Sequence, residues 1–198
     1  MARNTQPVLK RCRTLGVSPA VMGYSRTSNK NPGGQRRAKK SEYATQLTEK
    51  QKVKFVYGIQ EKQFHAYYEK ASKMAGNTGE ELLCMIERRL DNVVYRLGFA
   101  STRREARQLV NHGHFTVNGK RVNIPSYLVK TGDVVAVCEK SCSNAFFKKL
   151  KEDDVFAAAP KWLDRDKNTL TGKVIAAPAR EDIDFEIAEH LIVELYSK

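Results

Sequence analysis

Three arginines and a glutamine are spaced so that one helix would bring their side chains together. Arg103 and Arg107 are four residues apart, as are Arg104 and Gln108, and residues at this spacing are neighbours on a helix surface. A guanidinium group can bind phosphate oxygens in pairs through its planar fork of N–H donors. Like charges at this spacing destabilise an isolated helix by about 0.2–0.5 kcal/mol per pair. The spacing therefore predicts a helix whose outer face lies against phosphates, with a solvated charged face as the alternative.

The balance of charge along the chain also indicates an anionic partner. The 198 residues include 35 Lys and Arg against 22 Asp and Glu, which gives a net charge of +13. A field of this sign attracts polyanions, of which nucleic acid is the commonest in a cell. The charge is uneven: residues 1–60 hold 13 cations and two acids, residues 61–149 hold 15 and nine, and residues 150–198 hold seven and 11. We expect the N-terminal third to suit RNA best, and the acidic tail to pack or to contact a basic protein.

Two histidines, His112 and His114, flank Gly113 directly after the arginine-rich segment. A catalytic histidine needs a nucleophile or a carboxylate within hydrogen-bond reach, and the neighbouring sequence offers none. We expect these two side chains either to face RNA or to be structural. The sequence predicts no catalytic residue and no enzyme.

The four cysteines do not form a metal-binding pattern. Cys138 and Cys142 are close in sequence, but no second pair at metal spacing accompanies them, and a structural zinc site needs about four ligands. We expect no metal and no other cofactor. The sequence shows no apolar run near the roughly 20 residues that span a bilayer and no signal peptide. It therefore predicts a cytoplasmic chain without membrane contact.

The first part of the chain predicts a basic arm followed by helices. Glycine and proline interrupt any periodicity in residues 1–47, which we expect to be extended. Thr48 with Gln51 fits a capping box, which predicts a helix over 49–57. A second helix is expected over 60–75, with an aromatic stripe that packs in a core rather than stacking on bases.

The middle of the chain predicts further helices. A helical region over 78–97 divides into two if Asp91 caps a separate second helix. Thr102 with Glu105 forms a capping box, and the helix that it opens ends near Asn111, before a glycine.

The remaining residues predict strands and one more helix. Asn118-Gly119, between two alternating runs, indicates a hairpin with a type I′ turn, and residues 134–137 are typical of another strand. Phe146-Phe147 favours a helix. Short strands are expected around Trp162, which we assign to a core, around residues 174–175, and over 191–196.

These elements predict an α+β fold with four segments. They are an extended basic arm (1–47), a small helical domain (48–88), an RNA-binding module of a helix pair and a small antiparallel β-sheet (89–150), and a C-terminal segment whose strands pack back on the preceding domains (151–198).

The run from Arg89 to His114, RLDNVVYRLGFASTRREARQLVNHGH, closely resembles the RNA-binding module named after the fourth small-subunit ribosomal protein. Residues 117–127 and 130–133 continue the resemblance. The module occurs in several families, but the flanking residues 32–35, 41–43, 49–64 and 189–198 resemble the bacterial ribosomal family uS4 itself. The similarity covers essentially the whole chain.

Membership of this family would imply a structural constituent of the small ribosomal subunit. Such a protein binds small-subunit rRNA directly and early, at a junction of helices in the 5′ domain, and nucleates assembly of the subunit body. It lies near the place where messenger RNA enters, beside neighbouring ribosomal proteins, notably uS5, and influences translational accuracy. Some members repress their own messenger, which we leave open. Some also hold zinc near the N-terminus with four cysteines, but only Cys12 stands in that region here.

The residues expected to contact RNA are cations and polar groups of the module and of the segments before it. In the module they are Arg103, Arg104, Arg107, Gln108, His112, His114, Lys120 and Arg121. In the arm and the helical part they are Arg36, Arg37, Lys39, Lys40, Lys50, Lys52, Lys54 and Arg89.

Two other interpretations remain open from the sequence. The module could guide an rRNA-modifying enzyme, which would need a catalytic domain of about 100 residues or more. The arginine-rich helix could also belong to a helix-turn-helix factor that binds DNA. Competition between folded ribosomal RNA and duplex DNA distinguishes the second of these from an RNA-binding protein.

Overall fold

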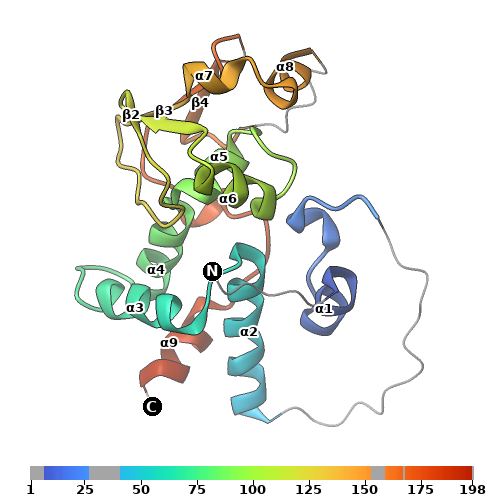
Figure 1. Cartoon of the computed structure of the whole chain (residues 1–198). Coiled ribbons are helices and arrows are strands. Elements are labelled where there is room, and N and C mark those ends of the chain that lie inside the picture. The colour runs from blue at the N-terminus through green and yellow to red at the C-terminus, as the bar shows by residue number, and fades with distance from the viewer. Residues whose placement is uncertain (1–6, 27–40, 153–158, 167, 198) are drawn as a thin grey trace. The chain divides into compact units, whose positions relative to one another are not determined.

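The computed structural model describes residues 7–26, 41–152, 159–166 and 168–197, which belong to two compact units (Figure 1). The first unit contains the residues up to Leu82 together with those from Ile183 on, and the second contains Leu83–Asp182. The described part of the first unit is helical, whereas the second combines helices with a sheet. The predicted α+β class is confirmed, and the four predicted segments stay a prediction.

Helices form the described part of the first unit. They are α1 (Val8–Leu15), a 3-10 turn η1 (Pro19–Met22), α2 (Glu42–Tyr57), α3 (Glu61–Ala71), the start of α4 (Thr78–Glu87) and α9 (Glu189–Ser197). None of the helices in the described segments has the length and apolar content needed to span a bilayer.

The N-terminal segment contains more helix than its glycines and prolines suggested. The prediction that residues 1–47 are extended is wrong for α1, which buries Cys12 and Leu15. It is also wrong for the first turns of α2, which begin after Ser41, whose side chain accepts a hydrogen bond from the backbone N–H of Ala44. The start predicted at residue 49 is therefore too late, because a better cap lies earlier in the chain.

The aromatic stripe of α3 packs in a core, as predicted. Phe64 and Ala71 are fully buried, and Tyr67 is nearly so. The helix ends at Ala71, four residues before the predicted end, so its length was overestimated.

The predicted strand over 191–196 is instead part of helix α9. A short apolar run does not distinguish a strand from a buried helix by periodicity alone. The helix packs along α2, where Ile192 is fully buried. At the start of α9, the backbone N–H of Ala188 donates to the Glu49 carboxylate at 3.2 Å. The run over 191–196 is thus helical where it packs on α2, a helix that is distant in sequence.

The second unit is built around a five-stranded antiparallel sheet. Its strands lie in the order β2-β1-β3-β5-β4 and are β1 (Phe115–Val117), β2 (Lys120–Arg121), β3 (Val134–Val137), β4 (Leu163–Asp166) and β5 (Thr171–Val174). The helices are the end of α4, α5 (Leu90–Arg96), α6 (Arg103–Asn111), α7 (Glu139–Cys142), α8 (Ala145–Glu152) and the 3-10 turn η2 (Arg180–Asp182).

Local signals set several of these elements correctly. The Thr102 side chain accepts a hydrogen bond from the backbone N–H of Glu105 at the start of α6, as the capping box predicts. Asn118 and Gly119 both have positive φ, 51° and 77°, as a type I′ turn requires. The division between α4 and α5 is also present, although Arg89 rather than Asp91 occupies the N-cap position of α5.

One face of the sheet packs on helices and forms the core of the second unit. Phe115, Phe147 and Trp162 are buried there, so the predicted core position of the tryptophan is confirmed. Gly172 on β5 allows close packing, because a Cβ at this position would lie 2.4 Å from the Leu97 side chain. This core fixes the position of α5 and α6, which carry the polar groups described next.

Candidate nucleic-acid interface

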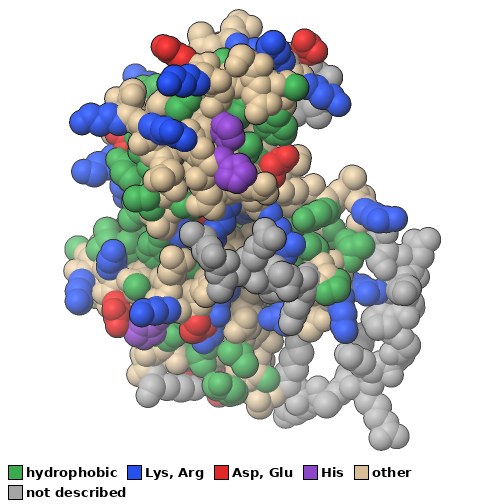
Figure 2. Space-filling model, viewed as in Figure 1, with side chains coloured by type: hydrophobic (Ala, Val, Ile, Leu, Met, Phe, Trp, Pro, Cys, Tyr) green, Lys and Arg blue, Asp and Glu red, His purple; other side chains and the backbone are tan. Residues whose placement is uncertain are grey.

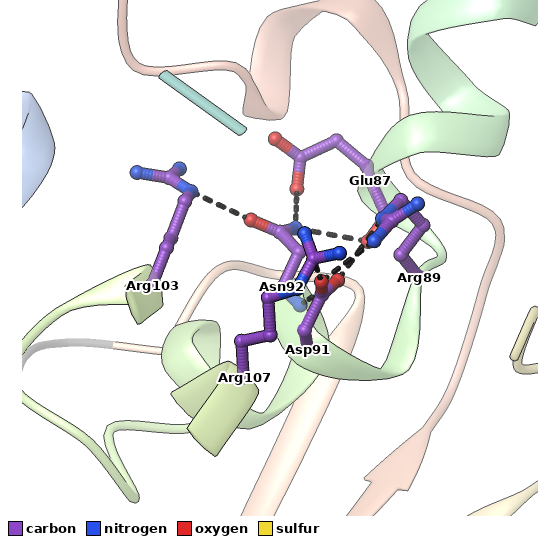
Figure 3. Close-up of polar contacts among 6 residues, drawn as sticks. All are labelled: Glu87, Arg89, Asp91, Asn92, Arg103 and Arg107. Carbon is purple, nitrogen blue, oxygen red and sulfur yellow. Dashed lines mark hydrogen bonds and ion pairs between the residues drawn. The ribbon is translucent and has the colours of Figure 1, made fainter. Parts of the chain in front are cut away.

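Asp91 at the start of α5 pairs with arginines from two elements (Figure 3). The Arg89 Nε and Nη2 atoms donate to the two carboxylate oxygens of Asp91 at 3.0 and 2.7 Å. The Nη1 atom of Arg107 on α6 lies 3.8 Å from the same carboxylate. Because Arg89 is fully buried, its charge depends on this carboxylate for compensation.

A second buried polar group lies next to the first and links α4, α5 and α6. The Asn92 side chain donates to the Glu87 carboxylate at 2.6 Å and accepts a hydrogen bond from Arg103 Nε at 2.8 Å. Arg96 forms an ion pair with Glu87 at 2.9 Å. The Arg103 guanidinium also lies over the Tyr95 ring, 4.4 Å from its centroid, at cation–π distance. The amide of Asn92 thus joins an acid on one helix to an arginine on another.

These contacts correct one geometric prediction about the arginines. Arg103 does not share an outer face with Arg104, because it is 6% exposed and turns toward Asn92 and Tyr95. The burial of Arg89 likewise leaves its guanidinium with no accessible surface. Periodicity within one helix could not reveal the partners that α5 supplies. We missed Glu87 and Asn92, for which the only sequence signal was polar groups inside an apolar, arginine-rich run.

Other predicted residues of α6 and the hairpin lie on the surface. Arg104, Gln108, His112 and Lys120 are exposed, and the side chain of Arg107 is 20% exposed. Figure 2 shows histidine side chains (purple) over the region of α6, and Lys and Arg side chains (blue) over the hairpin. The acids that pair with the inner arginines lie below this surface, since the side chains of Glu87 and Asp91 are 1% and 6% exposed.

Arg121 on β2 holds the end of α6. Its Nε atom donates to the Gly113 carbonyl at 2.8 Å and its Nη2 atom to the His112 carbonyl at 3.0 Å. Carbonyls at a helix C-terminus lack partners within the helix and interact favourably with cations. The guanidinium therefore joins the hairpin to α6, while the residue as a whole remains exposed.

His114 connects this surface to α7. Its Nδ1 atom lies 2.9 Å from the Ser141 hydroxyl, and its ring centroid is 6.0 Å from that of His112. Burial lowers the pKa of His114, and the nearby positive charges of His112 and Arg121 lower this pKa further. The neutral ring is therefore favoured at neutral pH, with a hydrogen-bonding role toward Ser141.

The predicted lysines of α2 make ion pairs within the first unit. Lys50 and Lys54 both contact the Glu61 carboxylate of α3, and Lys52 pairs with Glu49 at 2.7 Å. Burial alone would raise the pKa of Glu61, but hydrogen bonds from Lys54, Tyr196 and Lys50 outweigh it and lower this pKa to about 2. The Tyr196 hydroxyl donates to Glu61 at 2.7 Å, and burial together with this bond raises the pKa of Tyr196.

Four predicted residues, Arg36, Arg37, Lys39 and Lys40, lie outside the described residues. Within the described segments, no group of three or more His, Cys, Asp or Glu side chains could hold a metal ion. Cys138 and Cys142 are both unpaired by disulfide and partly buried.

Comparison with known proteins places the chain among ribosomal proteins rather than enzymes. Residues 3–87 match the family model described as the ribosomal protein S4/S9 N-terminal domain, and residues 88–135 match the S4 domain. Proteins named small ribosomal subunit protein uS4 are 64% identical in Caldicellulosiruptor saccharolyticus, 63% in Caldicellulosiruptor bescii and 52% in Fusobacterium nucleatum, each over 100% of both chains. The chain therefore belongs to the uS4 family of small-subunit ribosomal proteins.

Proposed function

We propose that this chain is a primary binder of small-subunit rRNA that nucleates assembly of the subunit body. The observation that carries the proposal is the α6–hairpin surface of the second unit, where exposed cations and polar groups lie above buried acids. Lys and Arg on such a surface neutralise phosphates and release counterions, which supplies affinity. The rigid fold selects a shaped RNA, since the major groove of an A-form helix is too narrow for side chains to read.

The direct contacts in this proposal come from the side chains that reach the surface. They are Arg104, Arg107, Gln108, His112, Lys120 and Arg121. Arg89 and Arg103 are buried and act by holding α5 and α6 in place. His114 acts by its hydrogen bond to Ser141, which joins it to α7. The lysines of α2 and Arg36, Arg37, Lys39 and Lys40 remain proposed contacts of the first unit. As part of the small subunit of a bacterial ribosome, the chain works in the cytoplasm.

We further propose the partners that the family resemblance implies. They are the neighbouring protein uS5 and messenger RNA close to where it enters the subunit, and through them the chain influences translational accuracy. Omission of the chain from a reconstitution of the small subunit should prevent formation of the body. A misreading reporter then tests the effect on accuracy once assembly is complete.

Replacing Arg104 and Arg107 together by Ala should weaken binding to a transcript of the 5′ domain of small-subunit rRNA. The slope of log affinity against log salt concentration should shrink by about one to two units, because each lost phosphate contact removes about one released counterion. Arg104→Ala alone, which leaves the contact of Arg107 with Asp91 intact, separates a binding effect from a folding effect. Filter binding at several salt concentrations measures the affinity and its salt slope for each variant.

An unchanged slope in the double variant would place these arginines off the interface. Preference of the unmodified chain for duplex DNA over the folded transcript at physiological salt would overturn the proposed function as a whole.

A further inference from the structure

A second group of lysines lies on α7 and α8, outside the residues 88–135 that match the S4 domain. Lys140 on α7 and Lys148 and Lys149 on α8 are all exposed. None of them was among the residues predicted to contact RNA. The sequence signal was the run FFKKLK, in which the apolar residues recur at helical spacing and lysines occupy the other positions.

Helix α8 is fixed to the core, so its lysines are presented from a rigid element. Phe147 is fully buried, with its ring centroid 6.1 Å from that of Phe115 and 5.8 Å from that of His114. The Asn144 side chain accepts a hydrogen bond from the backbone N–H of Phe146 at the start of the helix. The side chains on the opposite face therefore lose less freedom on binding than those of a mobile segment would.

Ion pairs do not neutralise these lysines among the residues that the structure describes. The salt bridges found there involve neither Lys140 nor Lys148 nor Lys149. Lys151 differs, because its charge contributes to the lowered pKa of Asp166, after the larger effect of hydrogen bonds from Thr169 and the neighbouring backbone. Exposed acids of the two helices are Glu139 and Glu152, which leaves a net positive face.

The lysines continue the surface already described rather than forming an isolated patch. His112 follows α6, His114 follows it in turn, and the His114 ring contacts Ser141 of α7 and Phe147 of α8. Figure 2 shows these side chains on the surface of the second unit, with histidines (purple) over α6 and Lys and Arg (blue) over α7 and α8. An RNA that covers α6 and the histidines therefore lies next to the further cations on α7 and α8.

We infer that the RNA-binding surface of the second unit extends across His114 onto α7 and α8, where Lys140, Lys148 and Lys149 bind a further stretch of the phosphodiester backbone of folded RNA. This inference rests on the proposed function. The ammonium groups act as point charges on long stems, so they suit phosphates without reading base sequence. The contribution is affinity and orientation of the unit on its RNA.

The test is the full chain with Lys148→Gln and Lys149→Gln, bound to a transcript of the 5′ domain of small-subunit rRNA. We expect affinity to fall about 3- to 30-fold at moderate salt and the salt slope to shrink by about one to two units. The matched control is Lys62→Gln with Lys70→Gln on α3, which makes the same change of net charge. There Glu61 and Glu69 directly precede the two exposed lysines, so the local surface is of mixed sign and the slope should stay unchanged.

Each outcome decides between the two proposals. If the α8 variant binds like the unmodified chain while Arg104→Ala weakens binding, the extension is wrong and the proposed function stands. An equal loss in the α8 and α3 variants would mean that only net charge matters, which also overturns the extension. If the unmodified chain fails to bind the transcript, the proposed function itself fails.

Discussion

Two groups of ion pairs, Lys50–Glu61–Lys54 in the first unit and Arg89–Asp91 with Arg96–Glu87 in the second, place their acids at different depths. In the first unit, the side chain of Glu61 is 48% exposed and lies at the surface between Lys50 and Lys54. In the second unit, the side chains of Glu87 at the end of α4 and Asp91 at the start of α5 are buried. A carboxylate at the surface offsets the field that an outside phosphate meets, whereas a buried carboxylate stabilises the inner arginines and leaves the outer face positive. The two groups of ion pairs therefore differ in the depth of their acids.

Replacing Asp91 by Ala should have the largest effect on stability. The change leaves Arg89 fully buried without its carboxylate partner, and removing one member of a buried ion pair costs about 3–5 kcal/mol. Urea unfolding followed by fluorescence measures the loss in the second unit, because Trp162 is the single tryptophan and is buried there.

The matched control for this change is Glu139→Ala, which removes an exposed acid of the same unit and should alter stability by no more than about 0.5 kcal/mol. A loss below about 1 kcal/mol for Asp91→Ala would contradict the contrast between buried and surface acids.

Replacing Gly113 by Ala should have the next largest effect. The residue has a φ of +72°, and a Cβ there would lie 2.4 Å from Arg121 Nε, so the guanidinium must leave the carbonyls that end α6. Backbone strain of about 1–2 kcal/mol and weakened hydrogen bonds together predict a loss of about 2–3 kcal/mol in the free energy of unfolding.

Gly119→Ala separates the two causes. Gly119 has a φ of +77° with no atom near the added Cβ, so only the strain remains. The difference in unfolding free energy between the two variants measures the contribution of Arg121. Equal losses would show that Arg121 contributes nothing to the join between the hairpin and α6.

Replacing Glu61 by Gln should have the smallest effect, which is present at neutral pH and disappears as pH falls toward 2. The pKa of Glu61 is lowered to about 2 in the folded chain, below its ordinary value. Its contribution to stability is therefore complete above about pH 4.5 and is lost as pH falls toward 2. Since the side chain is half exposed, solvent screens the pairing, and we expect about 0.5–1 kcal/mol.

Unfolding followed by circular dichroism at pH 5 and at pH 3 checks this expectation. The unmodified chain should lose more stability between the two values than Glu61→Gln does. An identical pH dependence would mean that the Lys50–Glu61–Lys54 group adds nothing to the first unit.

The elements with strong local signals could be predicted from the sequence. The cap at Thr102, the Asn118-Gly119 turn and the apolar stripes of α3 and α6 act over a few residues, and each is present in the structure. The exposed part of the candidate site follows from the same signals, since Arg104 and Gln108 lie on the outer face of α6 as their spacing indicates.

The rest depends on contacts between different elements, one of which joins segments distant in sequence. The inward turn of Arg103 requires Asn92 and Tyr95 of another helix, and α9 packs on α2, more than 130 residues away. The pairing of Lys50 and Lys54 with Glu61 likewise joins α2 to the first residue of α3. Periodicity within one element carries no information about such partners.

The discontinuity of the first unit has a consequence for synthesis of the chain. Residues 83–182 form the second unit without interruption, whereas the first unit needs α9, which the ribosome makes after the whole of the second. Domains generally fold as units while the chain emerges. The second unit can therefore fold during translation. Helix α2 can pack on α9 only after the second unit has been synthesised, so the first unit folds last.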